Sequence, residues 1–444
     1  MSSPDFNPGL NEAVAHYRSG RLDEAEQWCR ARLAEQPDSP HVLHLLGLVM
    51  LRHGRHVDAI EALQLACTAL PQSAAFRMSL GNAHASSGNH DAAAEIYREA
   101  LSLDPGLPEI RFNLAKALAR SGRRLDAAVM FLRLARGDQL SAAAEHELFD
   151  LLGSAPADLF PGPPHAHSTQ RKADLPVESV SIVICSNRDE KFRRIARQYE
   201  DLLGSHPHEI IRIADAASLC SGYARGFQQS TGALVVFSHD DIDILDPEFL
   251  PHLKQDMARV DLLGIAGTTR LTGPAYAWGG RASVRGWLFH QSGDGPYDAA
   301  IFDLEAGLAT DIVALDGAFF CARLAVVEGV GFDSATFDGF HLYDIDFSYR
   351  AHLAGFRIGV THDIAIAHES VGNFDATWKI YADRFLAKFP ALRAERIPVG
   401  LTRASFAKRK DAVDFVGRLR ALCRFAASAQ YSASGDKPNP VTEC

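Results

Sequence analysis

Small and apolar residues return along the first part of the chain at a fixed interval of 34 residues. The interval is kept by Gly20, Gly54, Gly88 and Gly122, by Ala25, Ala59, Ala93 and Ala127, by Pro37, Pro71 and Pro105, and by Leu46, Leu80 and Leu114. Glycine suits the turn between two paired helices, alanine lets those helices approach closely, and proline ends the second helix. The pattern therefore predicts helix pairs from residue 6 to about 140 that stack into a right-handed solenoid.

From Val180 onward the pattern changes to short apolar runs that alternate with amphipathic stretches. The runs VSIVICSN, EIIRIAD and ALVVFSHDD have the length and β-branched content of buried strands, and the stretches between them have helical periodicity. This alternation predicts a parallel sheet with an acidic residue at the end of successive strands. No GxGxxG follows the first strand and no GxxxxGK[ST] occurs, which argues against a dinucleotide enzyme or a P-loop NTPase.

Changes in composition divide the chain into five segments. Residues 6–153 are expected to form the solenoid, closed by a capping helix, and the five prolines of residues 154–179 indicate a linker. Residues 180–390 are expected to form the α/β domain. Residues 391–427 are expected to form one or two helices, and residues 428–444 a disordered polar tail.

A polar cluster follows the apolar run Ala233 to Phe237, at the carboxyl end of the third expected strand. It consists of His239, Asp240, Asp241 and Asp243. Ligands of open α/β sheets bind at this edge. Residues two apart on an extended backbone point the same way, so Asp241 and Asp243 are expected to converge while Asp240 faces the other side. Carboxylates this close favour a hard divalent ion, Mg²⁺ or Mn²⁺, and an acidic turn is the alternative.

The overall composition is that of an ordinary globular protein, 47% hydrophobic and 23% charged. A net charge of -10 gives no indication of a basic face and so argues against a general nucleic-acid binder. The seven cysteines are scattered without a CxxC pair, which favours a reducing compartment over a disulfide scaffold. The chain begins without a signal-peptide pattern, and no apolar run approaches the roughly 18 residues that span a bilayer. These features predict a cytoplasmic protein without a transmembrane segment.

Two parts of the chain resemble known protein families. The 34-residue lattice resembles the tetratricopeptide repeat over four units. Residues from about Val180 to Phe389 resemble the family-2-like glycosyltransferases of the GT-A fold, in the pieces SIVICSNR, VVFSHDDIDILDPEFL, DGAFFCAR and FDGFHLYDIDFSYRAHLAGFRI. The resemblance implies an α-solenoid followed by a Rossmann-like α/β domain with a mostly parallel sheet. It also implies a nucleoside-diphosphate sugar at the carboxyl edge of that sheet, with Mn²⁺ or Mg²⁺ on its diphosphate.

The same resemblance implies a role for each candidate site residue. Asp344 occupies the position of the base that deprotonates the acceptor hydroxyl, although the usual Glu-Asp pair is replaced here by Tyr343-Asp344. Asp241 is the first candidate metal ligand, because it belongs to the family's acidic metal-binding motif whether that motif is aligned with HDD (residues 239–241) or with DID (residues 241–243). The other candidate ligands are Asp243 and His368. The candidate donor contacts are Asp215 at the base, Asp240 at the ribose, Arg225 at the diphosphate, and Asp316 with Gly317 at the sugar.

Several of these residues also have a purely structural interpretation. Arg225 can be a surface arginine of a helix, and His368 a structural histidine at a strand end. Asp316-Gly317 can form a turn between two strands. Asp346, in the same segment as Asp344, is expected to pair with Arg350 four residues further on.

Two other segments carry expectations about local structure. Residues Thr268 to Gly295 are rich in glycine and aromatic residues, and are expected to form a loop on the acceptor side, or else a packed surface loop. Asp246 and Pro247 have the residue types of an N-cap and a first helical position, and are expected to begin a helix through Met257.

Taken together, these features and the resemblance indicate a metal-dependent glycosyltransferase, inverting as the resemblance implies, whose solenoid recruits a protein or peptide acceptor or partner. Asn82 and Asn113 are candidates for solenoid residues that bind a peptide backbone, and solvated helix positions are the alternative. The solenoid can instead serve as a spacer or mediate homodimerisation. Two rival functions remain: an inactive interaction scaffold, and a nucleotidyl or phosphosugar transferase on the same fold.

Overall fold

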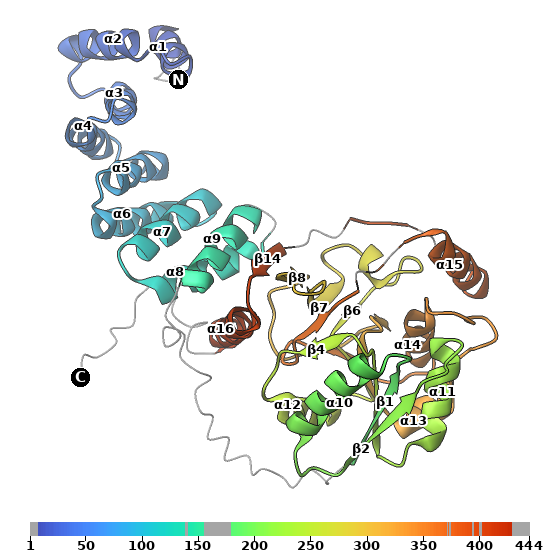
Figure 1. The fold of residues 1–444 in the computed structure, drawn as a ribbon. Helices are drawn as coiled ribbons and strands as arrows, with labels where there is room; N and C mark the ends of the chain where they lie inside the picture. Colours follow the sequence, from blue (N-terminus) through green and yellow to red (C-terminus); the bar gives the residue numbers. More distant parts are fainter. Residues whose placement is uncertain are drawn as a thin grey trace. The chain divides into compact units, whose positions relative to one another are not determined.

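The computed structural model describes residues 8–137, 141–154, 179–370, 372, 374–392, 395–398 and 402–428. The chain has two compact units, and the described residues up to 154 belong to the first and those from 179 to the second. Most of the expected linker and of the expected tail, and with them His165 and His167, lie outside the described residues. Figure 1 shows the helices and strands of both units.

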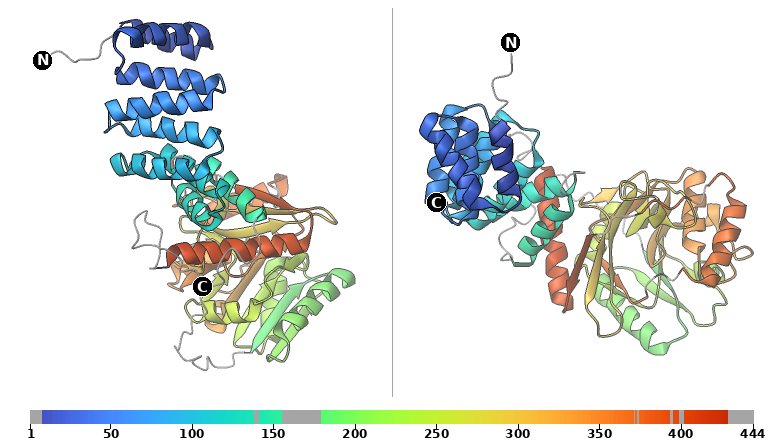
Figure 2. Two further views of the ribbon diagram at one scale, coloured as in Figure 1. Left: turned by 90° about the vertical axis from the view of Figure 1, so that its left-hand side faces the viewer. Right: turned by 90° about the horizontal axis from the view of Figure 1, so that it is seen from above.

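The described part of the first unit consists of helices and the short turns between them. Its helices are α1 (Pro8–Arg18), α2 (Leu22–Glu35), α3 (Pro40–Arg52), α4 (His56–Ala69), α5 (Ala74–Ser86), α6 (His90–Leu103), α7 (Pro108–Arg120), α8 (Arg124–Ala135) and α9 (Ser141–Ser154). Each helix packs on the next in the chain, and the left view of Figure 2 shows them stacked in a row. This is the solenoid that the 34-residue interval predicts.

The repeated glycines and alanines have the expected roles in the turns and between the packed helices. The repeat glycines turn the chain between paired helices in a left-handed conformation, with φ values of 80°, 75°, 84° and 89° for Gly20, Gly54, Gly88 and Gly122. The alanines that follow them, Ala25, Ala59, Ala93 and Ala127, are fully buried between helices. Gly81 lies so close to Tyr97 that an added Cβ would come within 2.6 Å of the tyrosine ring.

The two candidate peptide-binding asparagines bond to each other. The side-chain amide of Asn113 on α7 donates to Oδ1 of Asn82 on α5 at 3.1 Å, and the Tyr97 hydroxyl donates to the same oxygen at 2.6 Å. The first bond connects successive repeats and the second joins the two helices of one repeat, so both asparagines contribute to the cohesion of the solenoid in this structure.

The second unit is an α/β domain (Figure 1). Its first half contains β1 (Val180–Cys185), α10 (Asp189–Leu203), β2 (His208–Ile213), α11 (Leu219–Gln229), β3 (Leu234–Ser238), β4 (Ile242–Ile244), α12 (Phe249–Met257), β5 (Leu262–Gly264), β6 (Ala266–Thr268), the 3₁₀ turn η1 (Tyr276–Trp278) and β7 (Val284–His290). Its second half contains β8 (Tyr297–Ile301), β9 (Leu308–Ala309), β10 (Ala314–Leu315), β11 (Phe319–Arg323), α13 (Leu324–Val330), α14 (Tyr343–Leu353), β12 (Ile358–Thr361), β13 (Ile366–His368), α15 (Ala376–Lys388), β14 (Thr402–Phe406) and α16 (Arg409–Ala427).

The main sheet of this unit has the strand order β2-β1-β3-β11-β5-β12-β9. Strand β1 pairs in parallel with β2 and β3, and β5 pairs in parallel with β12, whereas β11 runs antiparallel to both of its neighbours. The three strands expected from the sequence therefore lie together and in parallel. Their carboxyl ends meet at one edge, as the sequence predicts.

Both faces of the main sheet are buried, because successive strand side chains point to opposite sides. Val235 and Phe237 of β3 join one core with residues of α11, α13 and α14. Leu234 and Val236 of the same strand join a second core with residues of α10 and α12 and of the second sheet. This double burial explains why the strands appear in the sequence as unbroken apolar runs.

The second sheet corrects two expectations. Its strand order is β10-β6-β7-β13-β4, with β8 paired to β7 and β14 paired to β8. Residues 391–427 were expected to be helical, but β14 within them pairs antiparallel with β8 from Thr402 to Phe406. Residues Thr268 to Gly295 are not a single loop either, because β7 crosses the sheet and buries Trp287 and Phe289.

The helix after the acidic stretch also begins later than the sequence suggests. Helix α12 starts at Phe249, and Asp246 precedes it as a buried carboxylate rather than as its N-cap. Asp246 Oδ2 lies 2.8 Å from His252 Nδ1, and Oδ1 lies 3.4 Å from Arg420 of α16. The partner from α16 is far away in the sequence, which explains why local capping rules mislead here.

Within the part of the chain that the structure describes, no helix combines the length and the apolar character needed to cross a bilayer.

Candidate active site

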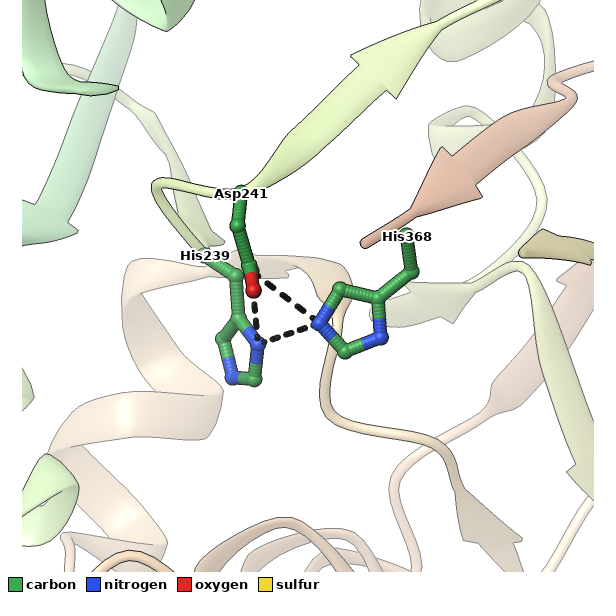
Figure 3. Close-up of side chains that lie close together, drawn as sticks. All are labelled: His239, Asp241 and His368. Atoms are coloured by element: carbon green, nitrogen blue, oxygen red, sulfur yellow. Dashed lines mark hydrogen bonds and ion pairs between the residues drawn. The ribbon is translucent and has the colours of Figure 1, made fainter. Parts of the chain in front are cut away.

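Three side chains meet where β3, β4 and β13 come together. His239 follows β3, Asp241 immediately precedes β4, and His368 ends β13. Strands β4 and β13 pair antiparallel, and the backbone N–H of Glu369 donates to the carbonyl of Asp241 at 2.9 Å. This pairing brings His368 beside Asp241 although the two are far apart in the sequence (Figure 3).

The three side chains point one ligand atom each toward a common centre (Figure 3). His239 Nδ1 lies 3.0 Å from His368 Nε2, His368 Nε2 lies 3.1 Å from Asp241 Oδ1, and His239 Nδ1 lies 3.8 Å from Asp241 Oδ1. To bind a metal, a histidine must be a neutral imidazole and an aspartate must be an ionised carboxylate. Two nitrogens and one oxygen in this arrangement fit a divalent cation.

The charge states that these residues adopt also suit a cation. Burial, together with the charge of His368, lowers the pKa of His239 to about 4, so its imidazole is neutral at pH 7. Burial by itself would raise the pKa of Asp241, but the hydrogen bond and charge of His368, with the charges of His239 and Lys191, hold it well below its usual range. At neutral pH the cluster thus has a carboxylate and an uncharged imidazole.

Asp243 does not belong to this cluster, so the expectation that it converges with Asp241 is wrong. Its carboxylate accepts hydrogen bonds from Gln198 at 2.7 Å, from Tyr297 at 3.2 Å and from Arg409 at 2.9 Å. The chain bends at Asp240 and Asp241 and becomes a strand only at Ile242. The two-residue alternation of an extended strand therefore does not apply between Asp241 and Asp243.

A second carboxylate site lies at the start of α14. Burial and the nearby charge of Asp316 raise the pKa of Asp344 to about 7, against an ordinary value of 3.8. Hydrogen bonds from the backbone at Gly317, Asp344 and Ile345 act in the opposite direction and limit this rise. Tyr276, on η1, is hydrogen-bonded to Asp316. A carboxyl group that titrates near neutrality is suited to accept a proton during a reaction.

Position 317 has no room for a side chain, so it requires a glycine. A Cβ at this position would lie 2.3 Å from the Tyr343 hydroxyl and 2.7 Å from Asp344 Cβ. The predicted pair Asp316-Gly317 therefore packs directly against the start of α14. The sequence placed these three residues in one site through family resemblance, and the structure brings them together.

The remaining predicted donor contacts are Asp240 after β3, Asp215 after β2 and Arg225 on α11. Asp240 accepts a hydrogen bond from the Ser186 hydroxyl at 2.6 Å. Asp215 and Arg225 form an exposed ion pair at 2.8 Å, which lowers the pKa of Asp215 through the hydrogen bond from Arg225. Arg225 is thus partnered by a carboxylate in this structure.

Three residues near the cluster were not assigned a site role from the sequence. His239 is one of them, although it stands in the HDD motif. Tyr343 is the second, and its hydroxyl lies 2.6 Å from His239 Nε2. Glu369 is the third: it binds Lys191 at 2.7 Å and Arg194 at 2.5 Å, and Lys191 Nζ lies 3.8 Å from Asp241. The histidine at the first position of the HDD motif was the one signal in the sequence that pointed to His239.

Comparisons with known proteins agree with both units. Residues 181–389 match a family described as "Glycosyltransferase like family". Residues 10–40 and 44–108 match one family described as "Tetratricopeptide repeat", and residues 84–145 match another of the same description. The expected fusion of tetratricopeptide repeats with a glycosyltransferase-like α/β domain is confirmed. A search of curated proteins finds no match to the chain.

Several solved structures are similar to part of the chain. The crystal structure of YrrB, described as a TPR protein with an unusual peptide-binding site, has 19% identity and a TM-score of 0.30, over 33% of this chain and 76% of that one. MamA from AMB-1 has 26% identity and a TM-score of 0.26, over 28% and 68%. TTC0263, a thermophilic TPR protein in Thermus thermophilus, has 22% identity and a TM-score of 0.29, over 34% and 83%.

Proposed function

We propose that this chain, which carries tetratricopeptide repeats and a glycosyltransferase-like domain at residues 181–389, transfers a sugar from a nucleoside-diphosphate sugar to an acceptor hydroxyl. One observation supports this most directly. The cluster of His239, Asp241 and His368 is joined through Tyr343 to Asp344, so a candidate cation site and a candidate base are neighbours at one sheet edge.

In this proposal Asp241 and His368 hold a divalent cation, Mn²⁺ or Mg²⁺, at the donor diphosphate. A bound cation stabilises the negative charge that develops on the leaving diphosphate. Asp215, Arg225 and Asp240 contribute the base, diphosphate and ribose contacts. Because Asp215 and Arg225 bond to each other without a ligand, donor binding would exchange part of that exposed ion pair for contacts with the nucleotide.

Asp344 is the proposed base. Its carboxylate accepts the proton of the acceptor hydroxyl while the oxygen of that hydroxyl attacks the sugar. An inverting displacement needs one base on the side opposite the leaving group, and a single Asp is enough for that role. Asp316 and Gly317 lie beside Asp344, and the transferred sugar is proposed to bind next to them.

The solenoid is proposed to recruit a protein or peptide acceptor, or a partner that carries the acceptor. An acceptor bound both to the repeats and to the catalytic edge would have a raised effective concentration at Asp344. The scaffold alternative is less favoured because a non-catalytic domain has no need of a partly buried carboxyl with a pKa near neutrality beside a candidate cation-binding cluster. Nucleotidyl or phosphosugar transfer would not require a base directed at an acceptor hydroxyl.

Slow donor hydrolysis offers a test that needs no knowledge of the acceptor. The purified chain is incubated with a panel of nucleoside-diphosphate sugars and Mn²⁺, and release of the nucleoside diphosphate is measured from pH 5 to pH 9. We expect release that depends on the cation and rises with pH until about pH 7, where Asp344 loses its proton, and then levels off. Release of a nucleoside monophosphate, or a rate that falls through the same pH range, would contradict the proposal.

A further inference from the structure

The Tyr343 hydroxyl determines which nitrogen of His239 has the proton. This hydroxyl has a single proton and lies 2.8 Å from the carbonyl oxygen of Gly317, which can only accept a hydrogen bond. The same hydroxyl oxygen lies 2.6 Å from His239 Nε2. Both contacts are favourable together only if Tyr343 donates to Gly317 and accepts from His239. His239 therefore has its proton on Nε2.

The other ring nitrogen of His239 consequently has a free lone pair. A neutral imidazole bears one proton, so when Nε2 is protonated, Nδ1 is a pure acceptor. Nδ1 is the atom that lies 3.0 Å from His368 Nε2 and 3.8 Å from Asp241 Oδ1. In metal sites, the hydrogen-bond partner of the ring nitrogen that does not bind the metal fixes the tautomer of a ligating histidine. Tyr343 has this position relative to His239.

The cluster is not fully buried. The side chains of His239, Asp241 and His368 keep 22%, 15% and 12% of their surface exposed. Three protein ligands with an open face are typical of metal sites that bind a substrate as well. The oxygens of a diphosphate could occupy that face.

We infer that His239 is a third protein ligand of the cation, held in its ligating tautomer by Tyr343, and that the site selects Mn²⁺ or a similar transition metal over Mg²⁺. This inference rests on the cation site of the proposed function. Magnesium prefers a shell of oxygen ligands, whereas imidazole nitrogens suit the first-row transition metals. Two imidazoles and one carboxylate disfavour Mg²⁺, and phosphate oxygens would complete a shell that Mn²⁺ accepts. Tyr343 is then a positioning residue, which acts on the cation through His239.

Metal binding by the full-length chain, without any donor, tests the ligand set. Free Mn²⁺ is measured by electron paramagnetic resonance during a titration, and Mg²⁺ is added as a competitor. We expect tight Mn²⁺ binding that Mg²⁺ displaces poorly. His239→Ala should weaken Mn²⁺ binding, and His239→Asp should lose most of the preference for Mn²⁺, since it replaces a nitrogen ligand by oxygen. His352→Ala, an exposed position on α14, is the control and should bind as the unaltered chain does.

Tyr343→Phe tests the positioning role, since it removes only the hydroxyl. We expect an affinity for Mn²⁺ about 10- to 100-fold lower, as is usual when the outer partner of a ligand is lost. We also expect an altered visible absorption spectrum of the Co²⁺-loaded chain, which a general loss of packing would not produce. Tyr381→Phe, which removes a hydroxyl bonded to Asp338 on the surface, is the matched control.

Asp241→Ala separates this inference from the proposed function. If Asp241→Ala abolishes Mn²⁺ binding while His239→Ala and Tyr343→Phe bind normally, the inference is wrong and the proposed cation site stands. If none of the three variants alters Mn²⁺ binding, both are wrong. Equal affinity of the unaltered chain for Mg²⁺ and Mn²⁺ would also overturn the inference. Should Tyr343→Phe fail to fold, the two His239 variants decide the matter.

Discussion

Replacing Asp344 by asparagine is expected to lower kcat for sugar transfer by about 10²- to 10⁴-fold, the usual contribution of a general base. The amide has nearly the same shape as the carboxyl group but cannot accept the proton of the acceptor hydroxyl. Binding of the nucleotide should be unchanged, because Asp344 is not one of the proposed donor or cation ligands. The measurement is steady-state kinetics of donor consumption, together with nucleotide affinity. A variant with normal kcat would exclude Asp344 as the base.

The stability of the same variant provides a control for folding. The pKa of Asp344 is raised from its ordinary 3.8 to about 7 in the folded chain. Between these two pH values the folded state binds more protons than the unfolded state, so stability falls as pH rises through that window. Asparagine does not titrate. Asp344→Asn should therefore melt at a higher temperature than the unaltered chain at pH 8, and this gain should shrink toward pH 4. A lower melting temperature at pH 8 would contradict this.

Replacing Asp346 by alanine is expected to destabilise the second unit by about 3–5 kcal/mol, the usual cost of removing one partner from a buried ion pair. Asp346 is 0% exposed. Its carboxylate binds Arg350 at 2.8 Å, as expected from the sequence, and Lys388 of α15 at 2.6 Å. The change leaves two cations with an empty cavity between them. We expect the melting temperature of this unit to fall by about 10 °C.

Asp383→Ala is the matched control for that change. Asp383 is also an aspartate paired with a lysine, but both side chains of its pair with Lys379 are exposed, 65% and 71% respectively. Exposed pairs of this kind contribute about 0–1 kcal/mol. Calorimetry should therefore separate the two variants clearly. If Asp346→Ala melts within about a degree of Asp383→Ala, the buried network does not hold α14 and α15 in place.

Much of the fold could be predicted from the sequence because the relevant signals are local. The glycines at Gly20 and Gly54 determine a turn through their own backbone conformation. Strand β3 is buried on both faces and so is recognisable as an apolar run. Asp344 and Asp346 could be placed at the start of a helix, and Asp346 was correctly paired with Arg350, because both features depend on neighbours within one helical turn.

The features that were missed depend on contacts between distant residues. Asp243 turns away from Asp241 because the chain bends before β4, and the carboxylate of Asp243 forms an ion pair with Arg409 of α16. Strand β14 is a strand because β8 is available to pair with it. His239 becomes a candidate ligand only when β13 brings His368 to within 3.0 Å. Neither spacing nor periodicity in the sequence contains that information.

The central claim is that a nucleotide and a divalent cation bind together at the edge formed by β3, β4 and β13. The most direct test is the melting temperature of the purified chain with a panel of nucleoside diphosphates and their sugars, each with and without Mn²⁺, repeated on Asp241→Ala. A ligand that binds only the folded state at 100 times its Kd stabilises the chain by about 2.7 kcal/mol. We predict a rise in melting temperature that requires both nucleotide and Mn²⁺ and is absent from Asp241→Ala. No rise with any pair, or an equal rise in Asp241→Ala, would contradict the claim.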